Sequence, residues 1–278
     1  MYKKMYVKAV IIFLTSVFLY TLISFGMLSE HMYISSGYFL VPFGIYFFIM
    51  NVIAVFMFYQ EKKQFYKDLS KAHSSVIDSM SFVVESRDAE TGAHIKRTKE
   101  YMICMGEYLY ENDIYKNLLT KEFRELVYRA APLHDIGKVA IPDNILKKPG
   151  KLTADEYTSM KEHSFLGKEI LQHALDENKD NAFLHRALNI AHSHHEKWDG
   201  SGYPQALKGT DIPLEARMMA LCDVYDALIS RRVYKESIPF EKSEQIIIES
   251  SGTHFDPILV GAFIALKEKF REITERIQ

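Results

Sequence analysis

Residues 194–204 read HHEKWDGSGYP and combine two adjacent imidazoles, a carboxylate and a glycine-rich turn that ends in Tyr203-Pro204. Neutral imidazoles are good ligands for divalent transition metals. Neighbouring side chains on a helix point about 100° apart, so His194 and His195 can both bind metal only at a helix end or by serving different ions. The glycines permit positive φ and stop the helix. The alternative is a surface helix end with two solvated histidines.

The composition favours a helical protein from a reducing compartment. The chain has 278 residues and a net charge of −2, so no basic excess indicates duplex DNA or RNA as the main partner. Its two cysteines, Cys104 and Cys222, stand far apart and in no metal-binding or redox spacing. Helix-forming residues dominate and no run of alternating strands is present, so we predict an all-α fold.

Two apolar runs near the N-terminus, Ala9–Leu28 and Gly37–Tyr59, are each long enough to cross the roughly 30 Å hydrocarbon core as a helix. Lysines precede the first run and follow the second, and residues 9–59 contain no Lys or Arg. The positive-inside rule then predicts a multi-pass protein of the cytoplasmic (inner) membrane, with both termini inside and residues 29–36 outside. The alternatives are a cleaved signal peptide and a buried helical hairpin.

Residues 61–86 are expected to form one helix leaving the membrane. Its apolar residues recur at intervals of three and four: Phe65, Leu69, Ala72, Val76, Met80 and Val83. Such a stripe suits a homodimer seam, but it spans only about three heptads, and packing on the helix's own domain is the alternative. We therefore expect a membrane anchor at 1–60, a signalling helix at 61–86 and a catalytic domain at 80–278.

Candidate metal-binding residues appear where the expected catalytic domain begins. Glu90 and His94 stand at i, i+4 and share a helix face, where they hold a metal or form a surface pair. His134-Asp135 stands among apolar residues, where polar groups need partners. The two oxygens of Asp135 can bridge two cations, as two-metal hydrolases require. Lys138 would face an anionic substrate or pair with a carboxylate.

The helical frame around these residues can also be read from the sequence. We expect Pro132 to kink the helix that carries His134, and Gly137 with Pro142 to end it. Thr153 and Glu156 form a capping box, so a helix begins near residue 154 and carries His163, which by itself is as well explained as a solvated or core imidazole.

A helix over 214–230 carries two acids on an apolar face. Asp223 and Asp226 are three residues apart, a spacing that implies metal or hydrogen bonds to cations. The basic residues Arg232 and Lys235 follow, as a phosphate-bearing substrate needs, although cations also suit a helix C-terminus.

In this order, His94, His134-Asp135 and Asp223 resemble the HD superfamily of metal-dependent phosphohydrolases. The added His163, His194-His195 and the DGSGYP stretch resemble its HD-GYP subfamily. The similarity covers about residues 80–270 and rests on ESRDAETGAH, LHDIGK, IPDNILKKPGKLT, HHEKWDGSGYP, IPLEARMMALCDVYDAL and SGTHFDP. It implies a helical metallo-phosphohydrolase domain that hydrolyses the bacterial second messenger cyclic di-GMP.

The resemblance also implies site residues. Its metal ligands fall on His94, His134, Asp135, His163, His194, His195 and Asp223. It implies two metal ions, commonly iron or manganese, bridged by Asp135, and Glu90 adds the expectation of a third. Its substrate contacts fall on Tyr203, Asp226, Arg232 and Lys235, with Asp135 and Lys138 as catalytic residues.

We therefore expect a membrane-anchored phosphodiesterase that converts cyclic di-GMP to linear pGpG, GMP or both. Two alternatives stay open. One is an enzyme of the same fold that acts on another cyclic dinucleotide, and the other is a non-catalytic module that binds cyclic di-GMP and signals through residues 61–86. The complete ligand set argues against the second.

Overall fold

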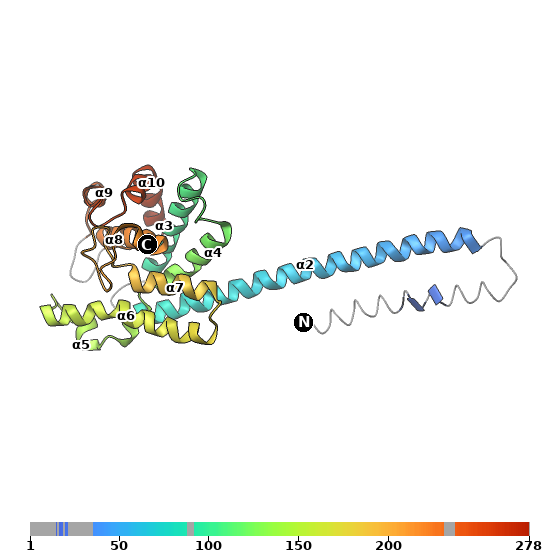
Figure 1. The fold of residues 1–278 in the computed structure, drawn as a ribbon, viewed down its shortest axis with the longest axis horizontal. Helices are drawn as coiled ribbons and strands as arrows, with labels where there is room; N and C mark the ends of the chain where they lie inside the picture. Colours follow the sequence, from blue (N-terminus) through green and yellow to red (C-terminus); the bar gives the residue numbers. More distant parts are fainter. Residues whose placement is uncertain are drawn as a thin grey trace. The chain divides into compact units, whose positions relative to one another are not determined.

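The computed structural model describes residues 15, 17, 18, 20, 21, 36–87, 92–230 and 237–277. These residues form helices joined by turns, and no strand occurs among them (Figure 1). This confirms the all-α prediction. The chain divides into two compact units, Met1–His73 and Ser74–Gln278, which are described separately.

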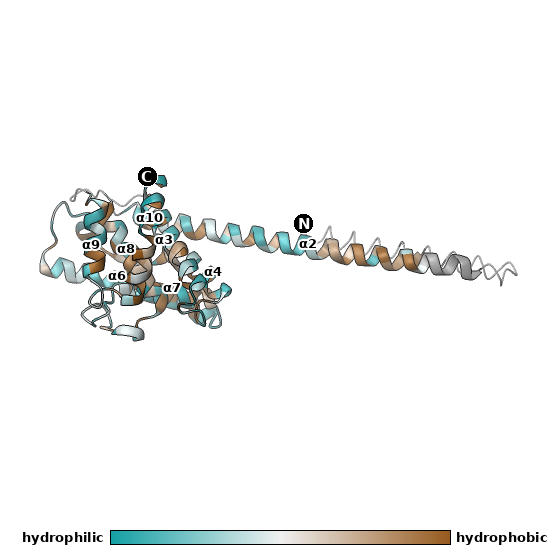
Figure 2. Ribbon diagram, turned by 90° about the horizontal axis from the view of Figure 1, so that it is seen from above, coloured by the Kyte–Doolittle hydropathy of each residue, from teal (hydrophilic) through white to brown (hydrophobic). Residues whose placement is uncertain are grey.

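Helix α2 (Ser36–Glu85) joins the second apolar run and the expected signalling helix in one element of 50 residues. We expected two consecutive segments, but residues 45–85 contain no glycine or proline that would interrupt a helix. Its stretch Gly44–Glu85 is long and apolar enough to cross a membrane, and the apolar window is not buried by the protein. Figure 2 shows hydrophobic residues in the first half of α2 and mainly hydrophilic ones in the second. The first apolar run lies almost entirely outside the described residues.

Eleven further α-helical or 3-10 segments occur among the described residues of the second unit. They are α3 (Gly92–Glu111), α4 (Lys121–Ala130), η1 (Ala131–Leu133), η2 (Ile136–Ala140), α5 (Asp143–Leu146), α6 (Ala154–Glu177), α7 (Ala182–Ser193), η3 (Gly209–Asp211), α8 (Leu214–Ile229), α9 (Phe240–Glu249) and α10 (Pro257–Arg276).

An aromatic cluster joins α3, α8 and α10 at the centre of this unit. Tyr101 stacks on Phe270 with ring centroids 4.6 Å apart, and Tyr225 packs edge-on against Tyr101 at 5.5 Å. Tyr101, Tyr225, Phe263 and Phe270 are all fully buried. Burial of such large side chains is the main stabilising contribution in a helical core. The cluster fixes α3 against α8, the two helices that carry His94 and Asp223.

The helix before His134 ends earlier than the sequence predicts. We expected Pro132 to kink a helix that continues to Gly137, whereas α4 ends at Ala130 and Pro132 lies in the first turn of η1. Proline lacks the N–H that a continuing α-helix would use, and it disfavours α geometry at the residue before it. His134 and Asp135 consequently lie between two 3-10 turns, where their side chains point in different directions.

Two predicted helix ends are confirmed and both place ligands. Thr153 and Glu156 form the capping box that starts α6. Helix α7 ends at Ser193 and His194 is its C-cap residue, so the two adjacent histidines do lie at a helix end. Helices α6 and α7 pack against each other, which brings His163 to the histidine pair.

Candidate metal centre

Seven predicted ligands from separate elements converge on one buried region. The group comprises His94 of α3, His134 and Asp135 between η1 and η2, His163 of α6, His194 and His195 after α7, and Asp223 of α8. Within it, one set of ligand atoms within 4.8 Å of one another comes from Asp135, His163, His194 and His195. A second set within the same distance comes from Glu85, His94 and His134. We call the whole region the metal centre.

Asp135 lies between the two sets and turns one oxygen toward each. Its Oδ1 is 3.3 Å from His163 Nε2 and 3.7 Å from His194 Nε2. Its Oδ2 is 3.3 Å from His134 Nε2 and 2.9 Å from Lys138 Nζ. The separations from the three histidines are those of neighbouring ligands around ions bound at about 2.0–2.2 Å, and the contact with Lys138 is an ion pair. The arrangement is the one expected of a carboxylate that bridges two cations.

Backbone carbonyls fix the orientation of three imidazole rings. Nδ1 of His134 lies 3.1 Å from the Ala131 carbonyl oxygen, and Nδ1 of His163 lies 2.7 Å from that of Met160. Nδ1 of His194 lies 3.0 Å from the Ile190 oxygen. An Nδ1–H that donates to a carbonyl leaves Nε2 as the basic nitrogen. All three rings therefore present a metal-binding nitrogen to the centre.

The fourth ring, His94, is held by a carboxylate. Its Nδ1 donates to Asp226 Oδ2 at 2.8 Å, while its Nε2 lies 3.6 Å from Asp223 Oδ1. Asp226 also accepts two hydrogen bonds from Arg97, at 2.6 and 2.8 Å, and one from Ser230 Oγ at 3.1 Å. The family resemblance assigned Asp226 to substrate, whereas its spacing from Asp223 predicted metal or hydrogen bonds to cations. The structure buries its carboxylate among these four donors, two of them from Arg97. Its observed role is to orient His94 and to balance the charge of Arg97.

The protonation states of the centre suit metal binding. Burial works against the charged form of Asp135, but Lys138 and His134 outweigh it and hold the pKa of that carboxyl well below its usual value. Burial lowers the pKa of His163 to about 4, and burial beside other imidazoles also lowers the pKa of His195. A charged carboxylate beside neutral imidazoles at His163 and His195 is the state that a divalent cation requires. Burial also works against the charged form of His134, but the neighbouring Asp135 and Asp223 carboxylates outweigh it and raise the pKa of that ring, so a cation must displace a proton there.

Two buried atoms indicate that the residues fit a metal. Asp135 Oδ1 and His194 Nε2 are buried and make no hydrogen bond with any described residue. Such atoms lose hydration at a cost unless a cation takes its place. A donor set of imidazoles and carboxylates suits a divalent first-row transition metal. The centre therefore fits the metal ions that the sequence implied, and Lys138 lies at its edge.

Glycine allows two close approaches around the centre. A Cβ at Gly137 would lie 1.9 Å from the His163 carbonyl oxygen, so only glycine lets η2 pack this tightly on α6. A Cβ at Gly202 would lie 2.3 Å from the Lys197 nitrogen. That second contact folds the 199–208 loop back onto the helix end that carries the paired histidines.

Tyr203 covers the centre from this loop. Its ring stacks on His195 with centroids 4.8 Å apart and planes at 28°, and its backbone N–H donates to the His195 carbonyl at 3.2 Å. The buried carboxylate of Glu196 accepts from the backbone N–H groups of Gln205 at 2.7 Å and Leu207 at 3.0 Å. These bonds fix the loop, and with it the aromatic wall beside His195.

Comparison with known proteins agrees with this geometry. A family model described as HD domain matches residues 95–259. The chain belongs to the HD domain family. Its relatives and the motifs described above place it in the HD-GYP group of that family.

Three relatives illustrate the range of named activities in this family. A cyclic di-GMP phosphodiesterase of Vibrio cholerae is 55% identical over 198 residues, which are 71% of this chain and 40% of that protein. The 3'3'-cGAMP-specific phosphodiesterase 2 of the same organism is 39% identical over 203 residues, 73% of this chain and 36% of that protein. A cyclic di-GMP phosphodiesterase of Thermotoga maritima is 34% identical over 222 residues, 80% of this chain and 57% of that protein. The chain thus spans less than two thirds of each relative's length.

Three residues of the HD domain were missed by the sequence analysis. Glu85, the last residue of α2, is 1% exposed and lies with His94 and His134 in the second ligand set. Arg97 donates hydrogen bonds to Asp226. Glu196 accepts a hydrogen bond from the backbone of the loop that carries Tyr203. The sequence did carry signals for them. Glu85 is the first residue of the motif ESRDAETGAH, Arg97 stands one helical turn after His94, and Glu196 directly follows the histidine pair.

Other expected site residues are not brought into the centre or cannot be placed. Glu90, Arg232 and Lys235 lie outside the described residues. His192, which precedes the histidine pair in the sequence, is half-buried, and burial together with the nearby Lys168 lowers its pKa.

Proposed function

We propose that this protein is a metal-dependent phosphodiesterase that hydrolyses cyclic di-GMP to linear pGpG, GMP or both. The observation that carries the proposal is the position of Asp135, with one oxygen toward His163 and His194 and the other toward His134. The names of the relatives in Vibrio cholerae and Thermotoga maritima support the substrate. Iron or manganese is the metal that we propose for the cell.

The residues of the centre divide the work of such a hydrolysis. Bound divalent ions supply Lewis acidity and lower the pKa of water. His134, His163, His194 and Asp135 hold these ions in place. Lys138 donates to Asp135 and keeps a positive charge where phosphoryl oxygens develop negative charge.

We also propose that the remaining predicted contacts serve the substrate. Arg232 and Lys235 bind a phosphate of the dinucleotide, because a planar guanidinium and an ammonium are the usual phosphate-binding groups. Replacement of both by Ala should raise KM and leave the metal content unchanged. An unchanged KM would remove them from the substrate site.

The test of the main proposal uses the full-length chain purified in detergent without oxygen and loaded with Fe(II) or Mn(II). Chromatography of the products of cyclic di-GMP should show linear pGpG or GMP, and chelation should abolish turnover. Failure of the metal-loaded protein to open cyclic di-GMP would refute the proposal, and binding without turnover would favour a signalling module.

The alternative substrate is another cyclic dinucleotide that contains guanine. The similarity to the 3'3'-cGAMP-specific enzyme supports this alternative. Parallel measurement of kcat/KM for cyclic di-GMP and 3'3'-cGAMP decides between the two. A higher kcat/KM for cyclic di-GMP supports the main proposal, and a higher kcat/KM for 3'3'-cGAMP supports the alternative.

We propose that residues 1–60 anchor the protein in the cytoplasmic membrane. Large apolar side chains of α2 are exposed there, among them Phe48 at 68% and Val55 at 68%. Such a surface is unfavourable in water and suits lipid. A reporter fused after Lys67 should behave as cytoplasmic, and a tag within residues 29–36 should be accessible from outside. The opposite pattern would reverse the topology.

We propose further that the chain forms a homodimer through residues 61–86. Val76, Met80 and Val83 of α2 are 54–63% exposed and follow one helical stripe. A cavity of about 570 Å³ runs beside them and is also lined by Val139 and Ile170. Cysteine at Val76 should cross-link two chains in membranes. Absence of cross-links at this position and at Met80 would contradict the seam.

A further inference from the structure

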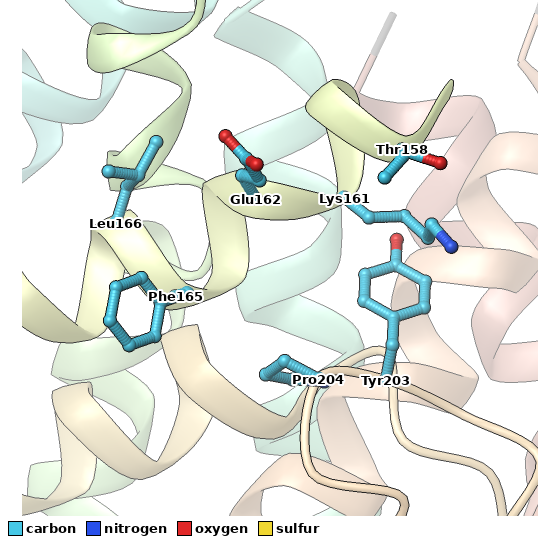
Figure 3. A pocket seen from close by; sticks show the side chains of 7 residues that line it. All are labelled: Thr158, Lys161, Glu162, Phe165, Leu166, Tyr203 and Pro204. Carbon is cyan, nitrogen blue, oxygen red and sulfur yellow. The ribbon is translucent and has the colours of Figure 1, made fainter. Parts of the chain in front are cut away.

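A pocket of about 530 Å³ lies between α6 and the loop that carries Tyr203 (Figure 3). Its walls are one face of α6 and the loop residues Tyr203 and Pro204. The α6 residues that line it are Thr158, Lys161, Glu162, Phe165 and Leu166. We call this cavity the α6 pocket. Its volume lies within the range of about 300–1,000 Å³ that small-molecule sites occupy.

The α6 pocket lies next to the metal centre. His163 belongs to the same helix, is 3% exposed and points inward, whereas Lys161 and Phe165 point outward from neighbouring positions. The Tyr203 ring that lines the pocket stacks at 4.8 Å on His195, a ligand residue of the metal centre. A group in the pocket is thus separated from His195 by one aromatic ring. A phosphate at the metals would carry its attached nucleoside in this direction.

Aromatic rings and charges of both signs meet in the pocket. The Phe165 ring is 48% exposed, and Lys161 Nζ lies 5.8 Å from the Tyr203 ring centroid. Among the described residues, neither Lys161 nor Glu162 forms an ion pair. The adjacent residues Lys168 and Glu169 of the same helix do pair, at 3.1 Å. The pocket therefore keeps one donor and one acceptor for a ligand.

We propose that the α6 pocket binds a guanine base of the dinucleotide and distinguishes it from adenine. The base would stack on the Tyr203 ring with Phe165 beside it, since aromatic side chains stack on nucleobases of every kind. The carboxylate of Glu162 would accept from N1–H and the N2 amino group of guanine, and Lys161 would donate to O6 or N7. Adenine offers an acceptor at N1 and a donor at N6, the reverse pattern. The inference rests on the proposed function.

A single guanine pocket would fix the orientation of a mixed dinucleotide. A ligand with a guanine and an adenine, such as 3'3'-cGAMP, would bind with its guanine in the pocket. Only one of its two phosphodiester bonds would then face the metal centre. The first product should therefore be one linear isomer, whereas a pocket without base discrimination would give two.

The experiment compares the full-length protein with Glu162→Gln and with the matched control Glu177→Gln. Glu177 is an exposed acid at the C-terminal end of the same helix, outside the pocket. The amide of glutamine presents a donor where guanine also has donors. We expect Glu162→Gln to raise KM for cyclic di-GMP about tenfold with kcat and metal content unchanged, because the base binds equally in ground and transition states.

The isomer ratio from 3'3'-cGAMP gives a readout that a merely structural change would not move. Wild type and Glu177→Gln should yield one linear isomer, and Glu162→Gln should yield a mixture. An unchanged KM together with an unchanged isomer ratio in Glu162→Gln would overturn the guanine assignment and leave the proposed hydrolysis intact.

A binding measurement keeps the inference testable if the wild type opens no dinucleotide. Calorimetric titration of GMP and AMP compares ligands with the same phosphate and different bases. We expect GMP to bind the wild-type protein about tenfold more tightly than AMP, with the preference lost in Glu162→Gln. Equal affinities in the wild type would overturn the proposal. A guanine preference without turnover would instead refute only the proposed function.

Discussion

The metal centre and the α6 pocket share a helix and the Tyr203 ring, yet they are built in opposite ways. In the centre, His134, His163 and His194 are 0–3% exposed, and each ring is fixed by a backbone carbonyl. In the pocket, Phe165 is 48% exposed, and Lys161 has only aromatic rings beside it. The difference separates two tasks. In the functions that we propose, the fixed and buried nitrogens bind metal ions, and the more exposed side chains contact the base of the ligand.

The comparison predicts that changes in the metal centre affect every substrate and the metal content together, whereas changes in the α6 pocket affect KM for particular bases. Both regions can be tested with near-isosteric substitutions.

The largest effect is expected from Asp135→Asn. The substitution keeps the side-chain volume and removes the charge that two ligand sets share, so bound metal and turnover should both be lost. We expect activity to fall on the order of 10³-fold or more. Elemental analysis of protein purified without oxygen, beside product chromatography, measures both quantities. Full metal content with wild-type turnover would exclude a bridging carboxylate.

A smaller effect is expected from Asp226→Asn, which leaves every ligand in place. The asparagine cannot balance the buried Arg97 guanidinium, and its amide holds the His94 ring less firmly. We expect metal affinity to fall about 10–100-fold and the free energy of unfolding to fall by about 3 kcal/mol. Metal titration and urea unfolding measure these changes.

The matched control is Ser230→Ala, which removes a hydroxyl that donates to Asp226 at 3.1 Å and accepts from Arg97 at 2.8 Å. It should change metal affinity by less than about threefold, since the charges of Asp226 and Arg97 and the direct hydrogen bonds between them remain. Equal effects of the two substitutions would mean that the Asp226 charge does not position His94.

The third prediction compares two acids near His94. Glu85 is buried in the second ligand set, and Glu90 is the residue to which the sequence analysis assigned a third metal. If Glu85 holds an ion with His94 and His134, Glu85→Gln should lower the metal content by about one ion per chain. Glu90→Ala should do so only if Glu90 is also a ligand. Unchanged content in Glu85→Gln would show that its carboxylate balances charge without binding metal.

The ligands of the metal centre were predictable because they lie in motifs with fixed local geometry. Adjacent histidines require a helix end or separate ions, and His194 is the C-cap residue of α7. His163 could be placed on α6 because the capping box at Thr153 fixes where that helix begins. In each case the relevant contacts are between residues close in sequence.

The surroundings of the ligands were not predictable in the same way. Asp226 and Arg97 are 129 residues apart in the sequence, and no local sequence pattern predicts their contact. An acid three residues after Asp223 and before a basic cluster was equally consistent with a substrate contact. The end of α4 at Ala130 was missed because the local effect of Pro132 was judged as a kink, whereas tertiary packing allows η1 to replace the next α-helical turn.

The smallest effect is expected at Tyr203, and it separates the ring from its hydroxyl. The ring stacks on His195 and lines the α6 pocket, and burial raises the pKa of the phenol, so the hydroxyl stays neutral. If Tyr203 serves as a wall, Tyr203→Phe should change kcat and KM by about twofold or less, and Tyr203→Leu should raise KM about tenfold through lost stacking. Steady-state kinetics with cyclic di-GMP measure both variants, and metal content should be unchanged in each. A loss of kcat in Tyr203→Phe as large as that in Tyr203→Leu would assign the hydroxyl to the reaction itself. In that case Tyr203 would belong to the metal centre as well as to the wall of the α6 pocket.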